Sequence, residues 1–149
     1  MLTNANSVIQ SIPFAQVLGL KLVNTTSSCV IGMLDVTNRL TTGKGTMHGG
    51  AVMSLADTLG AIGTMANLPE GASTTTIESK TNFIAAIPEG DTVKGVCTPL
   101  HLGRTTMVWQ TNVVRADGKT AAVITQTQLV MFAKGTNSSD NTKSECVEE

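Results

Sequence analysis

Aromatic and charged side chains are both scarce in this sequence. Phe, Trp and Tyr make up 3% of the 149 residues, and Asp, Glu, Lys and Arg make up 14%, with a formal net charge of −1. Proteins that bind nucleic acid present a basic surface to the phosphate backbone. The composition therefore excludes nucleic acid as a partner.

Cysteines and long apolar runs are also few. Cys29, Cys97 and Cys146 are odd in number and form no Cys-x-x-Cys pair, which fits reduced thiols better than a disulfide framework. No uninterrupted apolar run approaches the roughly 20 residues that span a bilayer. The first ten residues lack the basic and apolar regions of a signal peptide. We therefore expect a cytoplasmic protein with no membrane partner.

Candidate metal ligands are scarce as well. His48 and His101 stand alone, without the spaced Cys, His or Asp sets that hold zinc. Sequence fingerprints of serine hydrolases, P-loop nucleotide hydrolases and dinucleotide-binding proteins are also missing. We expect neither a metal nor a cofactor.

The remaining composition is that of an ordinary globular domain. Hydrophobic residues make up 41% of the chain, and 149 residues are enough to bury one sizeable core. The polar segment 135–149 has too few apolar side chains to fold, so we expect a disordered tail there. The predicted organisation is one domain over residues 1–134.

The order of apolar and β-branched segments predicts an α+β fold. A short helix that stops or restarts at Pro13 and ends at Gly19 comes first, followed by two strand-like segments and one long helix. Four further strands come after it, with a strong hairpin turn at Asp117-Gly118. An antiparallel sheet curved around such a helix would bury the helix fully. The predicted strands are residues 20–24, 29–36, 74–84, 91–100, 105–115 and 119–132.

The long helix holds the main candidate for chemistry. Residues 45–66 are apolar on nearly every side, and Asp57 is the one charged residue among them. Most helical carboxylates face solvent or a subunit interface, but the apolar neighbours of Asp57 leave no evident polar face. A buried carboxylate there would either be destabilised or be held by hydrogen-bond donors. We favour a functional role for Asp57.

Gly49 and Gly50 precede this helix and leave its first N–H groups sterically open. The positive end of a helix stabilises negative charge that develops on an oxygen, such as the carbonyl oxygen of a thioester. Gly49 and Asp57 are eight residues apart, so along one helix they are separated by ~12 Å. Both groups must lie about 3 Å from one reacting centre to act together. If the pair is catalytic, the protein is at least a homodimer with its sites on the interface.

Two further residues have alternative interpretations. His48 either bonds to the backbone beside the helix start or helps to orient the substrate. Arg104 is either an ordinary surface arginine or a contact for a phosphate-bearing ligand, with Lys44 or Lys94 nearby.

Several of these segments together resemble a known enzyme family. They are Thr46-Met-His-Gly-Gly-Ala-Val-Met-Ser-Leu-Ala-Asp57, Pro88-Glu-Gly-Asp91, Gly95-Val-Cys-Thr-Pro-Leu-His-Leu-Gly-Arg104, Val108-Trp-Gln110 and Asp117-Gly118. Residues 8–132 resemble the hotdog-fold acyl-CoA thioesterases of the phenylacetate-degradation type. This group includes 1,4-dihydroxy-2-naphthoyl-CoA and 4-hydroxybenzoyl-CoA thioesterases.

The resemblance implies a fold, a reaction and an assembly. The fold is a curved antiparallel sheet around a long central helix, and the substrate is an acyl-CoA or aroyl-CoA. The assembly is a dimer of hotdog domains that usually pairs into a homotetramer. Asp57 would be the nucleophile or general base, and the Gly49 N–H would bind the carbonyl oxygen. His48 would correspond to the histidine that precedes this glycine in the family's active site.

Substrate and CoA contacts are implied at eight positions: Thr42, Gly50, Thr76, Asn82, Phe83, Leu102, Gly103 and Arg104. Thr42 stands where many members of the family have Gln or Asn. The acyl pocket is expected to involve Val52, Met53, Ile62 and Phe83.

Two other functions stay open at this stage. A hotdog hydratase or dehydratase would also act on acyl thioesters, but the His-Phe-Pro pattern that those enzymes resemble is missing here. A non-catalytic acyl-CoA-binding module would bind the ligand without turnover.

Overall fold

The computed structural model of the protein describes residues 5–132. Its strands and its long helix lie within a few residues of the predicted segments, while the predicted tail at 135–149 lies outside the described residues. The helices are α1 (Ala5–Gln10), α2 (Pro13–Leu18) and α3 (Gly49–Met65), with a 3-10 turn at Asn38–Leu40. The strands are β1 (Lys21–Thr25), β2 (Val30–Asp35), β3 (Ser73–Phe83), β4 (Thr92–Leu102), β5 (Thr106–Val114) and β6 (Thr120–Met131).

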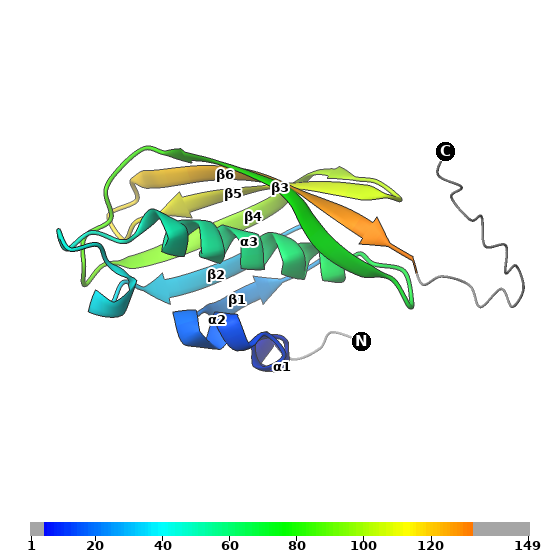
Figure 1. The fold of residues 1–149 in the computed structure, drawn as a ribbon, viewed down its shortest axis with the longest axis horizontal. Helices are drawn as coiled ribbons and strands as arrows, with labels where there is room; N and C mark the ends of the chain where they lie inside the picture. Colours follow the sequence, from blue (N-terminus) through cyan, green and yellow to red (C-terminus); the bar gives the residue numbers. More distant parts are fainter. Residues whose placement is uncertain (1–4, 133–149) are drawn as a thin grey trace, which may run out of the picture.

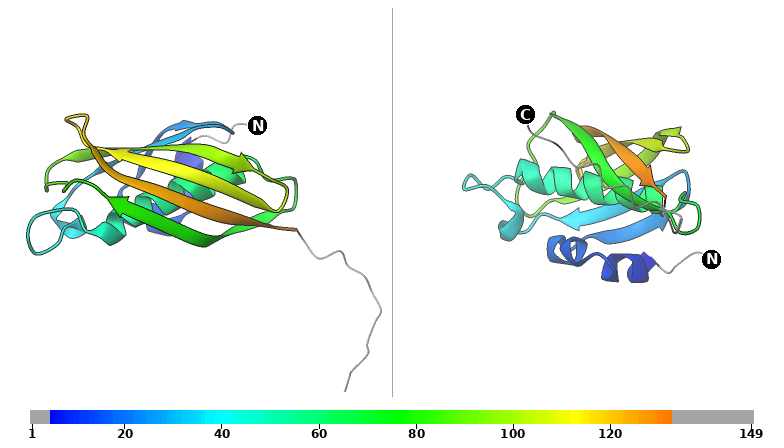
Figure 2. Two further views of the ribbon diagram at one scale, coloured as in Figure 1. Left: turned by 90° about the horizontal axis from the view of Figure 1, so that it is seen from above. Right: turned by 45° about the vertical axis from the view of Figure 1, so that its right-hand side comes forward.

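The six strands form one sheet in the order β1-β2-β4-β5-β6-β3, and every neighbouring pair is antiparallel. The chain leaves the sheet after β2, forms α3 across one face, and returns as β3 at the opposite edge (Figure 1). Helices α1 and α2 lie beside β1. This is the α+β arrangement that the sequence predicts, with a curved sheet partly wrapped around one long helix (Figure 2).

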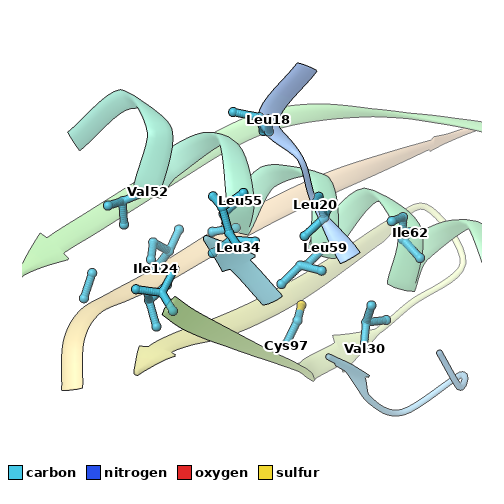
Figure 3. Packing of buried hydrophobic residues seen from close by; sticks show 14 of the residues in the cluster. Leu18, Leu20, Val30, Leu34, Val52, Leu55, Leu59, Ile62, Cys97 and Ile124 are labelled. Carbon is cyan, nitrogen blue, oxygen red and sulfur yellow. The ribbon is translucent and has the colours of Figure 1, made fainter. Parts of the chain in front are cut away.

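The inner side of α3 packs on the concave face of the sheet. Leu55, Leu59 and Ile62 point from the helix toward residues of β2, β4 and β6 (Figure 3), and each is 2% exposed or less. A Cβ at Gly32 or Gly95 would lie 2.6 to 2.8 Å from the side chain of Leu59. Glycines at these two strand positions therefore let the helix approach the sheet closely.

The outer side of α3 differs from the prediction. The helix was expected to be fully buried, yet Gly50, Met53 and Asp57 are exposed in the single chain, as is Met65 at the helix end. The reason is that one sheet covers only one side of a helix. The exposed stripe follows helical spacing and lies toward the edge strand β3, which packs against α3.

Strand β3 is the edge of the sheet nearest this stripe. Strand β3 pairs with β6 over its whole length, and its other edge has no partner strand among the described residues. A bulge interrupts the register between Thr76 and Glu78. A bulge inserts one residue and changes which side chains face inward. Thr76 before the bulge and Ser79 after it are both part-buried, whereas Ile77 and Glu78 between them are exposed.

Candidate active site

Helix α3 begins with a histidine cap that leaves one backbone N–H open. His48 is the N-cap residue, and its Nδ1 accepts a hydrogen bond of 2.9 Å from the N–H of Gly50. Within the described part of the chain, no hydrogen bond uses the N–H of Gly49. Because the helix end is positive, this open N–H is suited to bind an oxygen that carries negative charge. Gly49, rather than Gly50, is the free donor of the two.

The cap also defines the state of the His48 ring. Since Nδ1 accepts a hydrogen bond, the hydrogen of the neutral ring lies on Nε2. The sequence predicts either a bond from His48 to the backbone or a role in orienting the substrate. The structure shows the bond to the backbone. His48 as a whole is exposed in the single chain.

A cavity of about 380 Å³ lies beside Gly49. It is mainly apolar, and its walls come from the loop before α3, the first turns of α3, and the segment after β3. The ring of Phe83 reaches within 3.0 Å of the point where a Cβ of residue 49 would be, so only glycine fits there without displacing the ring. The lining residues are Thr46, Met47, Gly49, Val52, Phe83, Ile84, Ala85, Ala86, Ile87 and Ala121.

Two of the four residues expected in the acyl pocket line this cavity. Val52 and Phe83 do so, whereas Ile62 is 2% exposed and belongs to the core beneath α3. Met53 lies on the exposed stripe of the helix and is not part of the lining.

The Asp57 carboxylate is held by donors from two strands. Its Oδ1 accepts a 2.8 Å hydrogen bond from the Thr76 hydroxyl on β3 and a 3.3 Å bond from Nε2 of Gln126 on β6. Within residues 5–132, Oδ2 accepts no hydrogen bond. Hydrogen bonds to Oδ1 therefore fix the carboxylate, and Oδ2 stays available for a ligand. The sequence predicts a buried carboxylate that is either destabilised or held by donors. The structure supplies the donors but leaves Asp57 exposed in the single chain.

Gly49 and Asp57 do not meet within one chain. They lie eight residues apart on the same straight helix, which separates them by ~12 Å. Asp57 is also not among the residues that line the cavity. One copy of the chain therefore has two separate features. One is the cavity with the open Gly49 N–H, and the other is the hydrogen-bonded carboxylate of Asp57.

Arg104 lies at the other end of the sheet from the cavity. Its guanidinium is 6.0 Å from the centre of the Phe132 ring, just after β6. In the β3–β6 pair, Ser73 is opposite Met131 at this end and Phe83 is opposite Ala122 at the cavity end. The eleven residues of β3 between these ends span about 33 Å. Leu102, Gly103 and Arg104 thus do not contact the cavity of their own chain.

The other predicted contacts divide between the cavity and the surface. The hydroxyl of Thr42 lies 3.2 Å from that of Thr46, which lines the cavity, so Thr42 supports the cavity wall. Asn82 accepts a 2.7 Å hydrogen bond from Lys80. Because alternate residues of a strand face opposite sides, Asn82 points away from the side on which Phe83 lines the cavity.

Sequence reasoning missed two buried amides and most of the cavity wall. Gln126 and Gln128 are 1% and 0% exposed, at inward positions of β6 that alternate with part-buried residues. A polar residue at an inward strand position must find a hydrogen-bond partner, and this signal would have identified both glutamines. The segment 84–87 has no comparable signal, since its residues become a wall only through the fold.

Some site types have no basis in the described residues. Among residues 5–132, no group of three or more His, Cys, Asp or Glu side chains is arranged to hold a metal ion. In the same part of the chain, no helix is long and apolar enough to cross a membrane.

Comparison with known proteins identifies the family. Residues 44–122 match the model of the thioesterase superfamily, a range that begins just before α3 and ends within β6. The chain is also 31% identical over 100 residues to the putative esterase ComA2 of Bacillus subtilis, which covers 66% of this chain and 78% of ComA2.

Solved structures share the fold. The PaaI protein from the phenylacetic acid degradation operon of E. coli aligns with a TM-score of 0.76 at 24% identity, over 85% of this chain and 89% of PaaI. A hypothetical thioesterase protein from Streptococcus pneumoniae, solved with coenzyme A, aligns with a TM-score of 0.75 at 20% identity, over 85% of this chain and 99% of that protein. The chain therefore belongs to the thioesterase superfamily and has the hotdog fold, which makes it an enzyme of the thioester-hydrolysing class.

Proposed function

We propose that this protein hydrolyses an acyl-CoA or aroyl-CoA thioester to a free carboxylic acid and CoA, at sites shared between two copies of the chain. The observation that supports this most strongly is the open Gly49 N–H beside an apolar cavity of about 380 Å³. A cavity of that size and lining accommodates an acyl or aroyl group. The Gly49 N–H then binds the thioester carbonyl oxygen, on which negative charge develops as the carbonyl is attacked.

The attack requires Asp57. Its free Oδ2 either adds to the carbonyl carbon or takes a proton from a water molecule that adds there. In the first case the thiolate of CoA leaves, takes up a proton, and water then cleaves the acyl–aspartyl anhydride. In the second case the hydroxide adds directly and the same two products form. Both routes place a carboxylate oxygen within reach of the carbon.

A second copy of the chain would supply this carboxylate. Gly49 and Asp57 of one chain are too far apart for one reacting centre, whereas an antiparallel pair of α3 helices would bring the partner's Asp57 to Gly49. The exposed stripe of α3 and the unpaired outer edge of the long strand β3 lie on the side where such a copy would dock. We therefore propose a homodimer at minimum, and the family resemblance favours a homotetramer.

The CoA portion would extend away from the cavity toward positive charge. Arg104 is an exposed cation that lies far from the cavity of its own chain, so any contact with CoA phosphates there would come from another subunit. The hotdog protein solved with coenzyme A supports CoA as the ligand class. Phe83 and Thr46 would face the thioester end of the same ligand.

Thiol release from a panel of acyl- and aroyl-CoAs tests the proposal, comparing the wild type with Asp57→Asn. We expect the variant to lose about 10²-fold or more in kcat, as for removal of a catalytic carboxylate. Glu78→Gln is the matched control, because Glu78 is an exposed carboxylate on β3 that contacts Thr127 and not the cavity. It should keep wild-type activity.

The products separate the remaining outcomes. Hydration of an enoyl-CoA without thiol release would indicate a hydratase, and ligand binding without any turnover would indicate a binding module. Either result would contradict the proposed hydrolysis. Full activity of Asp57→Asn on a cleaved thioester would leave hydrolysis in place but remove Asp57 as the catalyst.

A further inference from the structure

A line of hydrogen bonds runs behind the Asp57 carboxylate. The Thr76 hydroxyl, which bonds to Asp57, also accepts a 2.7 Å hydrogen bond from Nε2 of Gln128. The Oε1 atom of Gln128 in turn lies 3.0 Å from the Thr74 hydroxyl, whose single hydrogen is shared between this atom and the carbonyl oxygen of Leu129, also at 3.0 Å. Gln128 is 0% exposed, so its amide reaches the site only through Thr76.

The direction of these bonds follows from the groups themselves. A carboxylate oxygen can only accept, so the single hydrogen of the Thr76 hydroxyl must point to Asp57. The Gln128 group that faces Thr76 must then be a donor, and the NH₂ group of the amide is in that place. If an acceptor stood there instead, it would compete with Asp57 for the same hydrogen.

We propose that Gln128 is a positioning residue for hydrolysis, because it fixes the Thr76 hydroxyl as a donor to Oδ1 of Asp57 and thereby keeps Oδ2 free and aimed. This inference rests on the proposed function of Asp57. Gln128 touches no reacting atom and acts only through Thr76.

The sheet register explains how the arrangement is held. Thr76 and Gln128 are direct partners across the β3–β6 ladder, just before the bulge that interrupts β3. Thr74, two residues earlier on β3, shares the inward face with Thr76. Nε2 of Gln126 donates to both the backbone carbonyl and Oδ1 of Asp57, so β6 contacts this residue at its backbone and at its carboxylate.

Two substitutions of similar size test the role of the Gln128 amide. Gln128→Met removes the donor and should lower kcat about tenfold or more while leaving KM nearly unchanged, as for loss of a hydrogen bond that orients a charged group. Gln128→Glu places an acceptor against Thr76 when the new carboxyl group is ionised and a donor when it is protonated. Its kcat relative to the wild type should therefore rise as pH falls, because burial favours the protonated form of the new group.

The control is Gln110→Glu, which makes the same change at a position of β5 that alternates with the buried Trp109 and Thr111. Its kcat relative to the wild type should not depend on pH. Thr74→Val is a milder variant at a part-buried edge position, and it should lower kcat a few-fold by releasing Oε1 of Gln128. Unchanged kcat in Gln128→Met, or a pH-independent ratio in Gln128→Glu, would overturn the proposal.

NMR couplings of the Thr76 side chain provide a readout that does not depend on activity. We expect one χ1 rotamer in the wild type and averaging in Gln128→Met. If the wild type cleaves no thioester but this averaging is seen, the proposed function fails while Gln128 still orders Thr76. If hydrolysis is found and Thr76 keeps one rotamer in Gln128→Met, the positioning role is wrong.

Discussion

At the scale of single residues, the carboxylate of Asp57 is ordered without being buried. Thr76 and Gln126 both donate to Oδ1, so the geometry distinguishes the two oxygens of one carboxylate. A buried carboxylate would need several donors to offset its lost hydration, whereas this exposed one needs only enough to fix its orientation. Docking of a second copy would then exclude water from a group whose direction is already set.

A second residue-scale feature is the thiol of Cys97, which is wholly buried on β4. Burial raises the pKa of this thiol from 9.0 to about 11. Between these values the unfolded chain loses the proton while the folded chain keeps it, so stability falls as pH rises from 9 toward 11. We expect this group to lower the unfolding free energy by about 2 kcal/mol between about pH 8 and about pH 10.5.

Urea unfolding of the wild type and Cys97→Ala at both pH values measures this contribution. The substitution lowers stability at each pH by creating a cavity, but only the wild type carries the alkaline loss from the thiol. The difference between the two proteins should therefore shrink at high pH. Equal losses in both proteins would contradict the assignment.

At the scale of elements, the position of α3 depends on small residues on both sides of its contact with the sheet. A Cβ at Gly60 would lie 2.5 Å from the amide of Gln126, and a Cβ at Gly63 would lie 2.7 Å from the Trp109 ring. The indole N–H of Trp109 also donates a 2.8 Å hydrogen bond to Thr64. The site and the core therefore share one packed helix face.

Gly60→Ala should disturb this face. Alanine favours a helix over glycine by roughly 1 kcal/mol, but crowding against buried Gln126 opposes that gain at a typical cost of 1–3 kcal/mol. We expect a net loss of stability of about 1 kcal/mol in denaturant unfolding, with a lower kcat because the same amide bonds to Asp57. Gly43→Ala is the matched control, since nothing lies within 4 Å of a Cβ there. Gly60→Ala as stable and as active as Gly43→Ala would argue against this tight contact.

At the scale of the whole molecule, the proposed function builds each site from two chains. Gly49→Leu fills the space now occupied by the Phe83 ring and should close the cavity of its own chain, while Asp57→Asn removes the carboxylate of its own chain. Each homodimer should therefore be inactive. In a mixed dimer with sites built from two chains, one site has both defects and the other has none.

Co-expression of the two variants tests this arrangement. Random pairing of a symmetric dimer should restore about a quarter of the wild-type activity per chain. Size-exclusion chromatography of each variant serves as the folding and assembly control. Activity that stays at the level of the separate homodimers would place both groups of a site in one chain.

Much of the fold and part of the site could be predicted because they depend on local signals. Segments rich in β-branched residues and the turn at Asp117-Gly118 predict the strands, and the apolar segment after Gly49 predicts α3. The open N–H at Gly49 follows from the same helix start, because the first donors of any helix lack partners within it. The ~12 Å separation of Gly49 from Asp57 needs only helix geometry.

The sequence by itself thus determined the order and type of the elements, the positive helix end and the lone carboxylate eight residues along the same helix. Only the tertiary structure decided that Asp57 is exposed in one chain, that Gln126 and Gln128 stand behind it, and that Arg104 lies at the far end of the sheet. The physical reason is strand register. Gln128 meets Thr76 across 52 positions of sequence, and such a contact depends on how β6 pairs with β3 and where the bulge lies, which no local pattern encodes.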